Sequence, residues 1–239
     1  MKIKLKNIYH GGHGGHGVKR SGIGMKLNIL LFCLAAVILN SCLGVSADIT
    51  IKADGSGKIA LEYRVSQTLE SLGRLDGNEG RPVVPVGKAD FERTISRIPG
   101  LKLSKYSSKE IKNSSGGKDL VTNATLDFKD TGALLAFLDS SGSRATLAEE
   151  GGAGKILRLN LLDPSQSATN PDLLALLKEV SSPYELSLSF NLPKNADIKM
   201  IPSAIPAAKI EAKGKKATFS IGMAELLSLN EGLVLEIRW

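Results

Sequence analysis

Apolar and polar residues alternate along most of the chain after residue 47, in runs of the length of a β-strand. In each run one set of alternate positions is apolar, which is typical of strands that cover a core with one face. The runs are Asp48–Lys52, Lys58–Val65, Leu101–Tyr106, Lys109–Lys112, Asp119–Phe128, Ala145–Ala148, Lys155–Leu162, Tyr184–Leu192, Ala207–Ala212, Lys216–Ile221 and Gly232–Trp239. The chain is therefore predicted to be rich in β-sheet.

Turn and helix signals separate these runs. Asp54-Gly55-Ser56-Gly57 predicts a tight hairpin, because Asp and Gly tolerate positive φ. Asp130 and Asn170 are predicted N-caps, and Pro171 stands at a first helical position, where its missing N–H is not needed. Other short helices are predicted near Ser66, Asp90 and Met223. Closely spaced strands with short helices between them indicate an α+β fold, mostly antiparallel sheet with several short packing helices. A mobile loop is predicted near 73–87.

One apolar run, Leu27–Leu39, does not alternate. It has thirteen residues, interrupted by Asn28, and it follows the basic residue Lys26. A membrane-spanning helix needs about 20 apolar residues, so this run fits the core of a secretory signal peptide better. We predict that residues 25–41 are a signal peptide and that residues 1–24 are an over-extended start or a long n-region.

Leu39-Asn40-Ser41-Cys42 ends the signal peptide and resembles the lipobox of bacterial lipoproteins. The resemblance implies cleavage before Cys42, lipidation of its thiol and attachment to a membrane. Residues 42–47 would then be the lipidated cysteine and a tether of at most ~17 Å, at about 3.3 Å per residue, and residues 48–239 a single α+β domain. Cleavage after Val45-Ser46-Ala47, which has small-x-small spacing, is one alternative and would release a soluble protein. An uncleaved N-terminal anchor is the other.

The two ends of the predicted mature chain resemble LppM-like bacterial lipoproteins. At the N-terminal end the resemblance rests on Asp48 and Thr50 followed by the Asp54–Gly57 turn, and at the C-terminal end on the alternating run Gly232–Trp239. It implies a β-rich, membrane-tethered domain. No functional residue is carried over from it.

Removing residues 1–41 changes the charge of the chain. These residues contain six basic and no acidic side chains, so 31 − 6 = 25 basic residues face 24 acidic ones, and the formal net charge falls from +7 to +1. Nucleic-acid binding needs a clustered basic face. A nearly neutral mature chain gives no support for it, and no nucleic-acid partner is predicted.

Histidine and cysteine are almost confined to the leader. His10, His13, His16 and Cys33 precede the predicted cleavage site, which leaves Cys42 as the one cysteine of the mature chain. An intramolecular disulfide and histidine-dependent zinc or catalytic centres are therefore excluded from the predicted mature domain. The glycine-rich histidine segment could bind a transition metal, but it precedes the signal peptide, so no metal or cofactor is predicted.

Leucine-rich and lysine-rich segments are candidates for membrane contact. The segments Ala133–Leu138 and Leu173–Leu177 could bind a lipid or enter the bilayer, although apolar helix stripes of this kind usually pack in a core. Lys213-Gly214-Lys215-Lys216 could contact anionic headgroups, or form a solvated hairpin turn. The structural interpretation is favoured for both.

Paired carboxylates are candidates for glycoside cleavage. Asp127 with Asp130, or Glu149 with Glu150, could act as an acid and a base. Adjacent residues of a strand point to opposite faces, and carboxylates in such positions are usually solvated. No catalytic residue is therefore predicted.

The predicted function follows from Cys42, the only site assigned. We expect an exported, lipid-anchored lipoprotein of the bacterial cell envelope that acts as a non-catalytic binding or structural module at the membrane surface. One alternative is a carrier of a lipid or other hydrophobic ligand, with an apolar cavity of roughly several hundred Å³. The other is a histidine-free carboxylate hydrolase with convergent carboxylates in a cleft. The protein or lipid partner is left open.

Overall fold

The computed structural model describes residues 43–66, 87–113, 116–139, 144–150, 154–162, 171–203 and 205–239. The predicted signal peptide, Cys42, the N-terminal histidines, Asn170 and all but the last residue of the predicted mobile loop lie outside the described residues. None of the helices in these ranges is long and apolar enough to cross a membrane.

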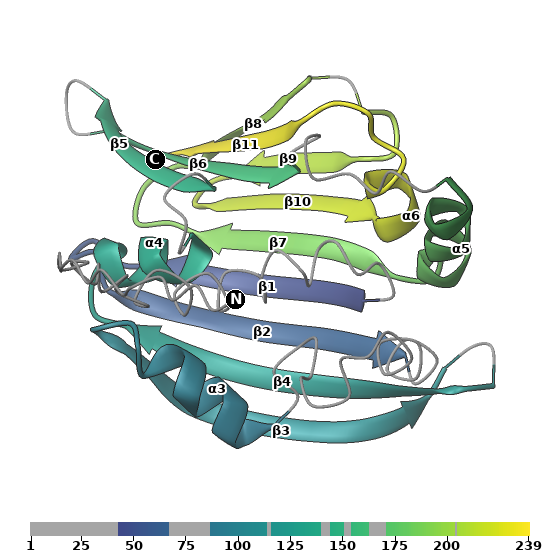
Figure 1. The fold of residues 1–239 in the computed structure, drawn as a ribbon. Helices are drawn as coiled ribbons and strands as arrows, with labels where there is room; N and C mark the ends of the chain where they lie inside the picture. Colours follow the sequence, from purple (N-terminus) through teal and green to yellow (C-terminus); the bar gives the residue numbers. More distant parts are fainter. Residues whose placement is uncertain are drawn as a thin grey trace, which may run out of the picture.

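Seven strands form the larger sheet, in the order β3-β4-β2-β1-β7-β10-β9. Neighbouring strands are antiparallel, except that β1 and β7 are parallel. This pairing places the N-terminal strand in the middle of the sheet (Figure 1). The strands are β1 (Leu43–Ile51), β2 (Gly57–Ser66), β3 (Leu101–Lys112), β4 (Lys118–Phe128), β7 (Glu185–Asn191), β9 (Lys209–Lys213) and β10 (Lys216–Gly222).

Four strands form the smaller sheet, which is wholly antiparallel, in the order β5-β6-β11-β8. Its edge strand β8 approaches β9, the edge strand of the larger sheet, so the two sheets meet along that side. The strands are β5 (Ala145–Glu150), β6 (Gly154–Leu162), β8 (Asp197–Ile201) and β11 (Leu233–Arg238). The predicted α+β fold with mostly antiparallel sheet is confirmed.

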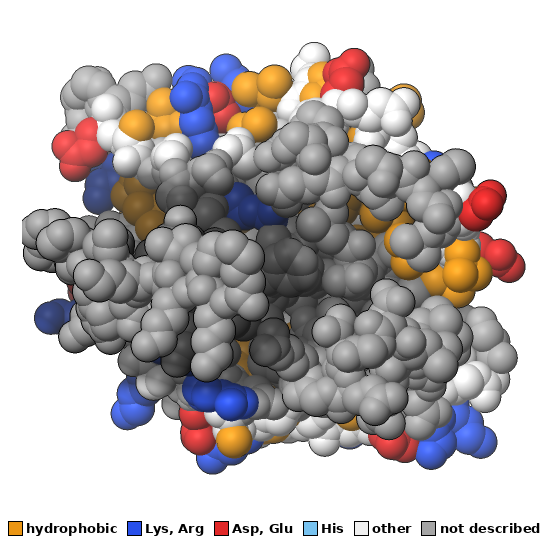
Figure 2. All heavy atoms as spheres, viewed as in Figure 1, with side chains coloured by type: hydrophobic (Ala, Val, Ile, Leu, Met, Phe, Trp, Pro, Cys, Tyr) orange, Lys and Arg blue, Asp and Glu red, His pale blue; other side chains and the backbone are white. Residues whose placement is uncertain are grey.

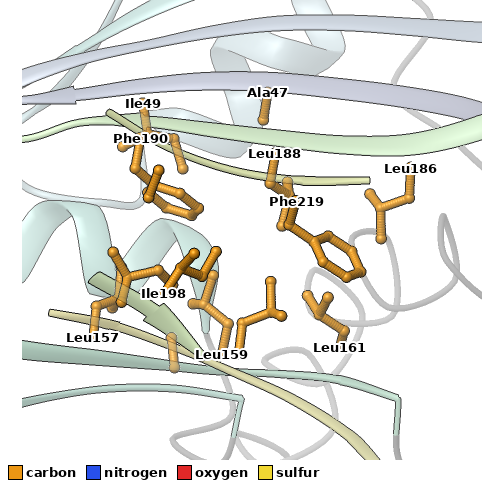
Figure 3. Close-up of a cluster of buried hydrophobic side chains, with 14 of the residues drawn as sticks. Ala47, Ile49, Leu157, Leu159, Leu161, Leu186, Leu188, Phe190, Ile198 and Phe219 are labelled. Atoms are coloured by element: carbon orange, nitrogen blue, oxygen red, sulfur yellow. The ribbon is translucent and has the colours of Figure 1, made fainter. Parts of the chain in front are cut away.

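The two sheets enclose the main core (Figure 3). Alternation along each strand places apolar side chains in this core, and in β1 these include Ile49, while Asp48 beside it is exposed. Phe190 of β7 and Phe219 of β10 face the smaller sheet, and each is at most 1% exposed. Burying a large apolar side chain stabilises a fold by about 1.5–3 kcal/mol, so this interface dominates the stability of the molecule.

Four short helices complete the described fold: α3 (Lys88–Ile95), α4 (Thr131–Leu138), α5 (Pro171–Ser181) and α6 (Met223–Leu226). α3 lies across β3 and β4 (Figure 1) and carries the centre of a second apolar cluster. Its Phe91 ring stacks on Tyr63 of β2 at 5.9 Å between ring centroids and meets the Tyr106 ring of β3 edge-on at 5.8 Å. One apolar face of the larger sheet is thus shared between the smaller sheet and α3.

Several local predictions are confirmed. The Asp54–Gly57 turn joins β1 and β2 as an antiparallel hairpin, and Gly55 has a φ of 82°, which favours glycine. The Asp130 side chain caps α4 by accepting a hydrogen bond from the Ala133 N–H at 2.9 Å. Pro171 is the first residue of α5, as its sequence context predicts.

The predicted tether is wrong. β1 begins at Leu43 and not at Asp48, so residues 43–47 belong to the sheet. They pair with β2 on one side and with β7 on the other, and the Ala47 side chain is only 6% exposed. The partner strand β7 lies far along the sequence, so its pairing with these residues left no local signal.

Three other elements differ from the prediction. Leu101–Lys112 is one strand and not two, and the predicted break at 107–108 is a polar stretch within it; a bulge between Leu103 and Lys105 also shifts its alternation. α3 begins at Lys88, before the predicted Asp90. The short strand β8 was not predicted, since it lies in a proline-rich stretch.

Candidate functional site

A polar pocket of about 380 Å³ lies on the larger sheet, on the face opposite the core. It forms where β1 begins, β2 ends and β7 begins, because these three strands are neighbours in the sheet. Its lining residues are Gly44, Val45, Ser46, Glu62, Arg64, Pro183, Tyr184, Glu185 and Ser187.

The strand register explains why these side chains converge. Gly44 pairs with Arg64, and Ser46 pairs with Glu62 on one side and with Ser187 on the other. Paired residues of a sheet point to the same face. Gly44 contributes no side chain, and a Cβ there would lie 3.3 Å from Tyr184 Cδ1. The glycine therefore keeps the pocket open between β2 and the segment that leads into β7.

Charge in the pocket is mixed. The Arg64 guanidinium binds the Glu62 carboxylate, with Nη2 3.1 Å and Nε 3.2 Å from Oε1. Both side chains are more than a third exposed, so the pair contributes at most about 1 kcal/mol to stability. Glu185, which is exposed, adds a second carboxylate. The pocket therefore carries one guanidinium, two carboxylates and the hydroxyls of Ser46 and Ser187.

The wall of the pocket is held in place by a buried hydrogen-bond network. The Tyr184 hydroxyl donates to Asp119 Oδ1 at 3.0 Å, and Asn113 Nδ2 donates to the same oxygen at 2.8 Å. Tyr184 and Asp119 are both buried. A fixed wall with exposed donors and acceptors is suited to reversible binding of a polar ligand through hydrogen bonds.

The pocket lies at the end of the sheet where the chain enters it from the predicted anchor. Gly44 and Ser46 are two and four residues after Cys42, and Leu43 already pairs with Val65 of β2. β1 then runs through eight residue steps to Ile51, or about 26 Å at ~3.3 Å per step. The pocket is therefore close, along the chain, to the residue that the sequence predicts to be lipidated.

The predicted carboxylate pairs occupy other positions. Asp127 forms an ion pair with Lys58, with Nζ 3.4 Å from Oδ1, and Asp130 serves as the cap of α4. Glu149 is exposed on the edge strand β5, and Glu150 ends that strand. Each pair is thus placed outside the pocket. Among the described residues, no cluster of three or more metal-ligating side chains was found.

The two leucine-rich segments differ from each other. In α4, Ala133 and Leu134 are buried in the main core, which agrees with the packing interpretation. In α5, Leu176 is 43% exposed, while Leu177 and Val180 are half-buried. The apolar face of α5 is therefore only partly covered.

The lysine-rich turn joins β9 and β10 and is fully exposed. Lys216 pairs with Asn191 at the end of β7, and Asn191 pairs with Thr50 near the end of β1. This register places the turn at the opposite end of the sheet from Leu43. If the chain is anchored at Cys42, this end of the sheet is the one further from the anchor.

The pocket residues could not be identified from the sequence. Ser46, Glu62 and Arg64 occupy the polar positions of alternating strands and have the pattern of solvated residues. Only the parallel pairing of β1 with β7 adds Glu185 and Ser187, which lie about 140 positions further along the chain. The absence of a side chain at Gly44 is the one local signal.

No family model matches the chain, and no curated protein matches it. Among solved structures, the chain is similar to the folded domain of the LppM protein of Mycobacterium tuberculosis, determined by NMR. The TM-score is 0.41 at 13% identity, over 83% of this chain and 90% of that chain. This neighbour bears the name of the lipoproteins that the two ends of the sequence resemble, and the lipobox and the lipidation of Cys42 stay predictions.

Proposed function

We propose that the protein is a lipid-anchored, non-catalytic binding module of the bacterial cell envelope, with its polar pocket held at the membrane surface. The anchor is the lipidated thiol of Cys42. The ligand is a polar group displayed at that surface, bound by the hydroxyls and charges around Gly44.

The position of β1 carries the proposal. Cleavage after Ala47, the alternative to lipoprotein processing, would remove five of the nine residues of a central strand. Cleavage before Cys42 leaves β1 intact. The fold is therefore compatible with lipoprotein processing and is damaged by ordinary secretory cleavage.

β1 begins at Leu43, the residue directly after Cys42, and this supports a fixed orientation of the domain on the membrane. Since Leu43 is already paired in β1, an anchored chain would hold the β1 end of the sheet against the bilayer. Leu176 of α5 adds to this argument. α5 leads through Pro183 into the start of β7, beside Gly44, so an exposed leucine lies near the same end.

Within the part of the chain that the structure describes, no comparable observation supports either of the other two functions. The described pocket is polar and lies outside the core, whereas a carrier of hydrophobic ligands needs an apolar cavity. Phe190 and Phe219, which lie between the two sheets, are each at most 1% exposed. The carboxylates predicted for a hydrolase have an ion-pairing or capping role, or lie on an edge strand.

Incorporation of radiolabelled palmitate tests the anchor. Wild-type protein and Cys33→Ala are expected to carry the label and to sediment with membranes, because Cys33 lies in the predicted signal peptide. Cys42→Ala is expected to lose the label. Label that persists in Cys42→Ala, or a mature protein that begins at Asp48 in the medium, would refute the proposal.

A further inference from the structure

Four lysines gather at the end of the sheet opposite the pocket. We call Lys194, Lys213, Lys215 and Lys216 the lysine tip. Three of them belong to the turn between β9 and β10, where Gly214 has a φ of 57°. Lys194 lies in the loop that follows β7. All four side chains are exposed.

The backbone holds the two segments of the lysine tip together. The Leu192 N–H donates to the Lys215 carbonyl at 2.8 Å, and the Ala196 N–H donates to the Gly214 carbonyl at 2.7 Å. Lys194 lies between these two donors in the sequence. The positive charges of the tip are therefore close together because of the fold, although Lys194 and Lys213 are nineteen positions apart in the sequence.

Local acidic groups do not balance this charge. Among the described residues, no ion pair involves Lys213, Lys215 or Lys216. The carboxylates nearest along the chain are Asp197, which begins β8, and Glu211, in the middle of β9. Lys213, Lys215 and Lys216 therefore give this turn an excess of positive charge, on a chain that is nearly neutral once residues 1–41 are removed.

The distance from the anchor limits which anion the tip can meet. If Cys42 is lipidated, the length of β1, about 26 Å, separates the tip from the bilayer. Screening reduces electrostatic attraction beyond about 8 Å at physiological ionic strength. The anionic headgroups of the anchoring membrane are therefore too far away to attract the tip, which points into the space beyond the membrane surface.

The chemistry of the tip favours phosphate groups on a flexible polymer. Residues 192–196 and 213–216 contain lysine but no arginine or aromatic residue. Protein interfaces are enriched in aromatic residues and arginine and depleted in lysine. Arginine binds carboxylates and phosphates through two bonds of fixed geometry, whereas lysine binds phosphate as a point charge and needs no fixed geometry, which suits the phosphates of a flexible chain.

We propose that the lysine tip binds a linear phosphate-bearing polymer of the envelope, on the side of the module that faces away from the membrane. Lysines on a short exposed turn contact successive phosphates, and release of the counterions of the polymer drives the association. The orientation in this proposal rests on the proposed anchoring at Cys42. Binding of the polymer itself does not.

Fluorescence anisotropy with labelled inorganic polyphosphate tests this binding, with the full protein as isolated from cells and kept in a non-ionic detergent. Lys213→Ala, Lys215→Ala and Lys216→Ala are combined in one variant, and Gly214 is retained so that the turn is unchanged. The matched control combines Lys102→Ala, Lys105→Ala and Lys109→Ala on β3, which removes the same charge from exposed positions elsewhere.

The tip variant is expected to bind at least tenfold more weakly than wild type, and the slope of log K against log salt is expected to decrease in magnitude by about two, given ~0.7–0.9 per phosphate contact in nucleic acids. The control is expected to lose less than threefold. Equal losses in both variants would overturn the proposal, as would tighter binding to polyglutamate or to phosphatidylglycerol vesicles. Because the assay does not need the lipid, loss of the anchor in Cys42→Ala leaves its outcome unchanged.

Discussion

At the scale of single residues, Glu236 is a buried carboxylate held between two arginines. It lies in β11 and binds Arg158 on β6, with Nε 2.7 Å from Oε1, and Arg238, with Nη2 3.1 Å from Oε2. Burial alone would raise the pKa of Glu236. The hydrogen bonds and charges of the two arginines outweigh burial and hold this pKa below its ordinary value of 4.5.

A lowered pKa makes stability depend on pH in a defined direction. Because the folded protein binds the proton of Glu236 less tightly than the unfolded chain, the stabilisation is complete above pH 4.5 and is lost as the pH falls through the lowered pKa. Urea unfolding of wild type at a series of pH values is expected to show this loss. Glu236→Gln is expected to reduce the free energy of unfolding by about 1–2 kcal/mol at pH 7, since Arg158 is exposed and partly screened.

The same substitution is expected to flatten the pH dependence below pH 4.5. Glu149→Gln, on the exposed edge strand β5, is the control and is expected to retain the wild-type curve. A Glu236→Gln curve parallel to that of wild type would show that this carboxylate does not carry the acid sensitivity.

At the scale of elements, alternation predicted most strands because the core covers one face of each sheet. The pattern Tyr184, Leu186, Leu188 and Phe190 is buried as predicted. The alternation of apolar residues did not predict the limits of strands that depend on pairing with a distant strand or that contain an irregularity. β1 starts early because of its distant partner β7, and β3 was divided in the prediction because its residues after the bulge at Ser104 include few apolar ones.

Because β1 begins at Leu43, the stability of the domain is expected to depend on the residue at which the mature chain begins. A chain exported behind an unrelated cleavable signal and beginning at Leu43 is expected to retain the native stability. A chain beginning at Asp48 loses five paired residues of a central strand, including the buried Ala47. At about 1 kcal/mol per backbone hydrogen bond, the loss is about 5 kcal/mol or more, which is comparable with the whole stability of many domains.

Thermal unfolding followed by circular dichroism compares the two chains. A third chain that begins at Leu43 and carries Ser46→Ala controls for a change at the exposed pocket face, and it is expected to match the unmodified Leu43 chain. Equal melting temperatures for the Leu43 and Asp48 chains would show that the N-terminal half of β1 is dispensable and would restore ordinary secretory cleavage as an option.

At the scale of the whole molecule, the larger sheet has two ends of different chemistry. The start of β1 is at one end of the sheet and the turn between β9 and β10 is at the other (Figure 1). The polar pocket lies at the first end and the lysine tip at the second. On the side shown in Figure 2, Lys and Arg side chains are interspersed with Asp and Glu around the rim. The lysine-rich turn was recognisable in the sequence, whereas the pocket became recognisable only when the sheet order placed Gly44, Glu62 and Glu185 together.

This arrangement can be tested with Trp239, the single tryptophan. Trp239 exchanges backbone hydrogen bonds with Lys155, and the preceding Arg238 pairs with Asp197, next to Ala196, which binds the lysine tip. Trp239 therefore lies at the end of the molecule opposite the pocket, as the C-terminus in Figure 1 shows.

The measurement is quenching of tryptophan fluorescence by lipids that carry a nitroxide on the headgroup. The lipoprotein is isolated from membranes and reconstituted in vesicles that contain these lipids. The fluorescence of Trp239 is expected to be almost unquenched, because the length of β1, about 26 Å, separates it from the bilayer. A second protein combines Trp239→Phe with Ser46→Trp, which places the only indole at an exposed position of the pocket. Its fluorescence is expected to be strongly quenched, because position 46 lies four residues from the lipid attachment. Stronger quenching of Trp239 than of the indole at position 46 would mean that the module lies with its other end on the membrane, and the pocket would then face away from the bilayer.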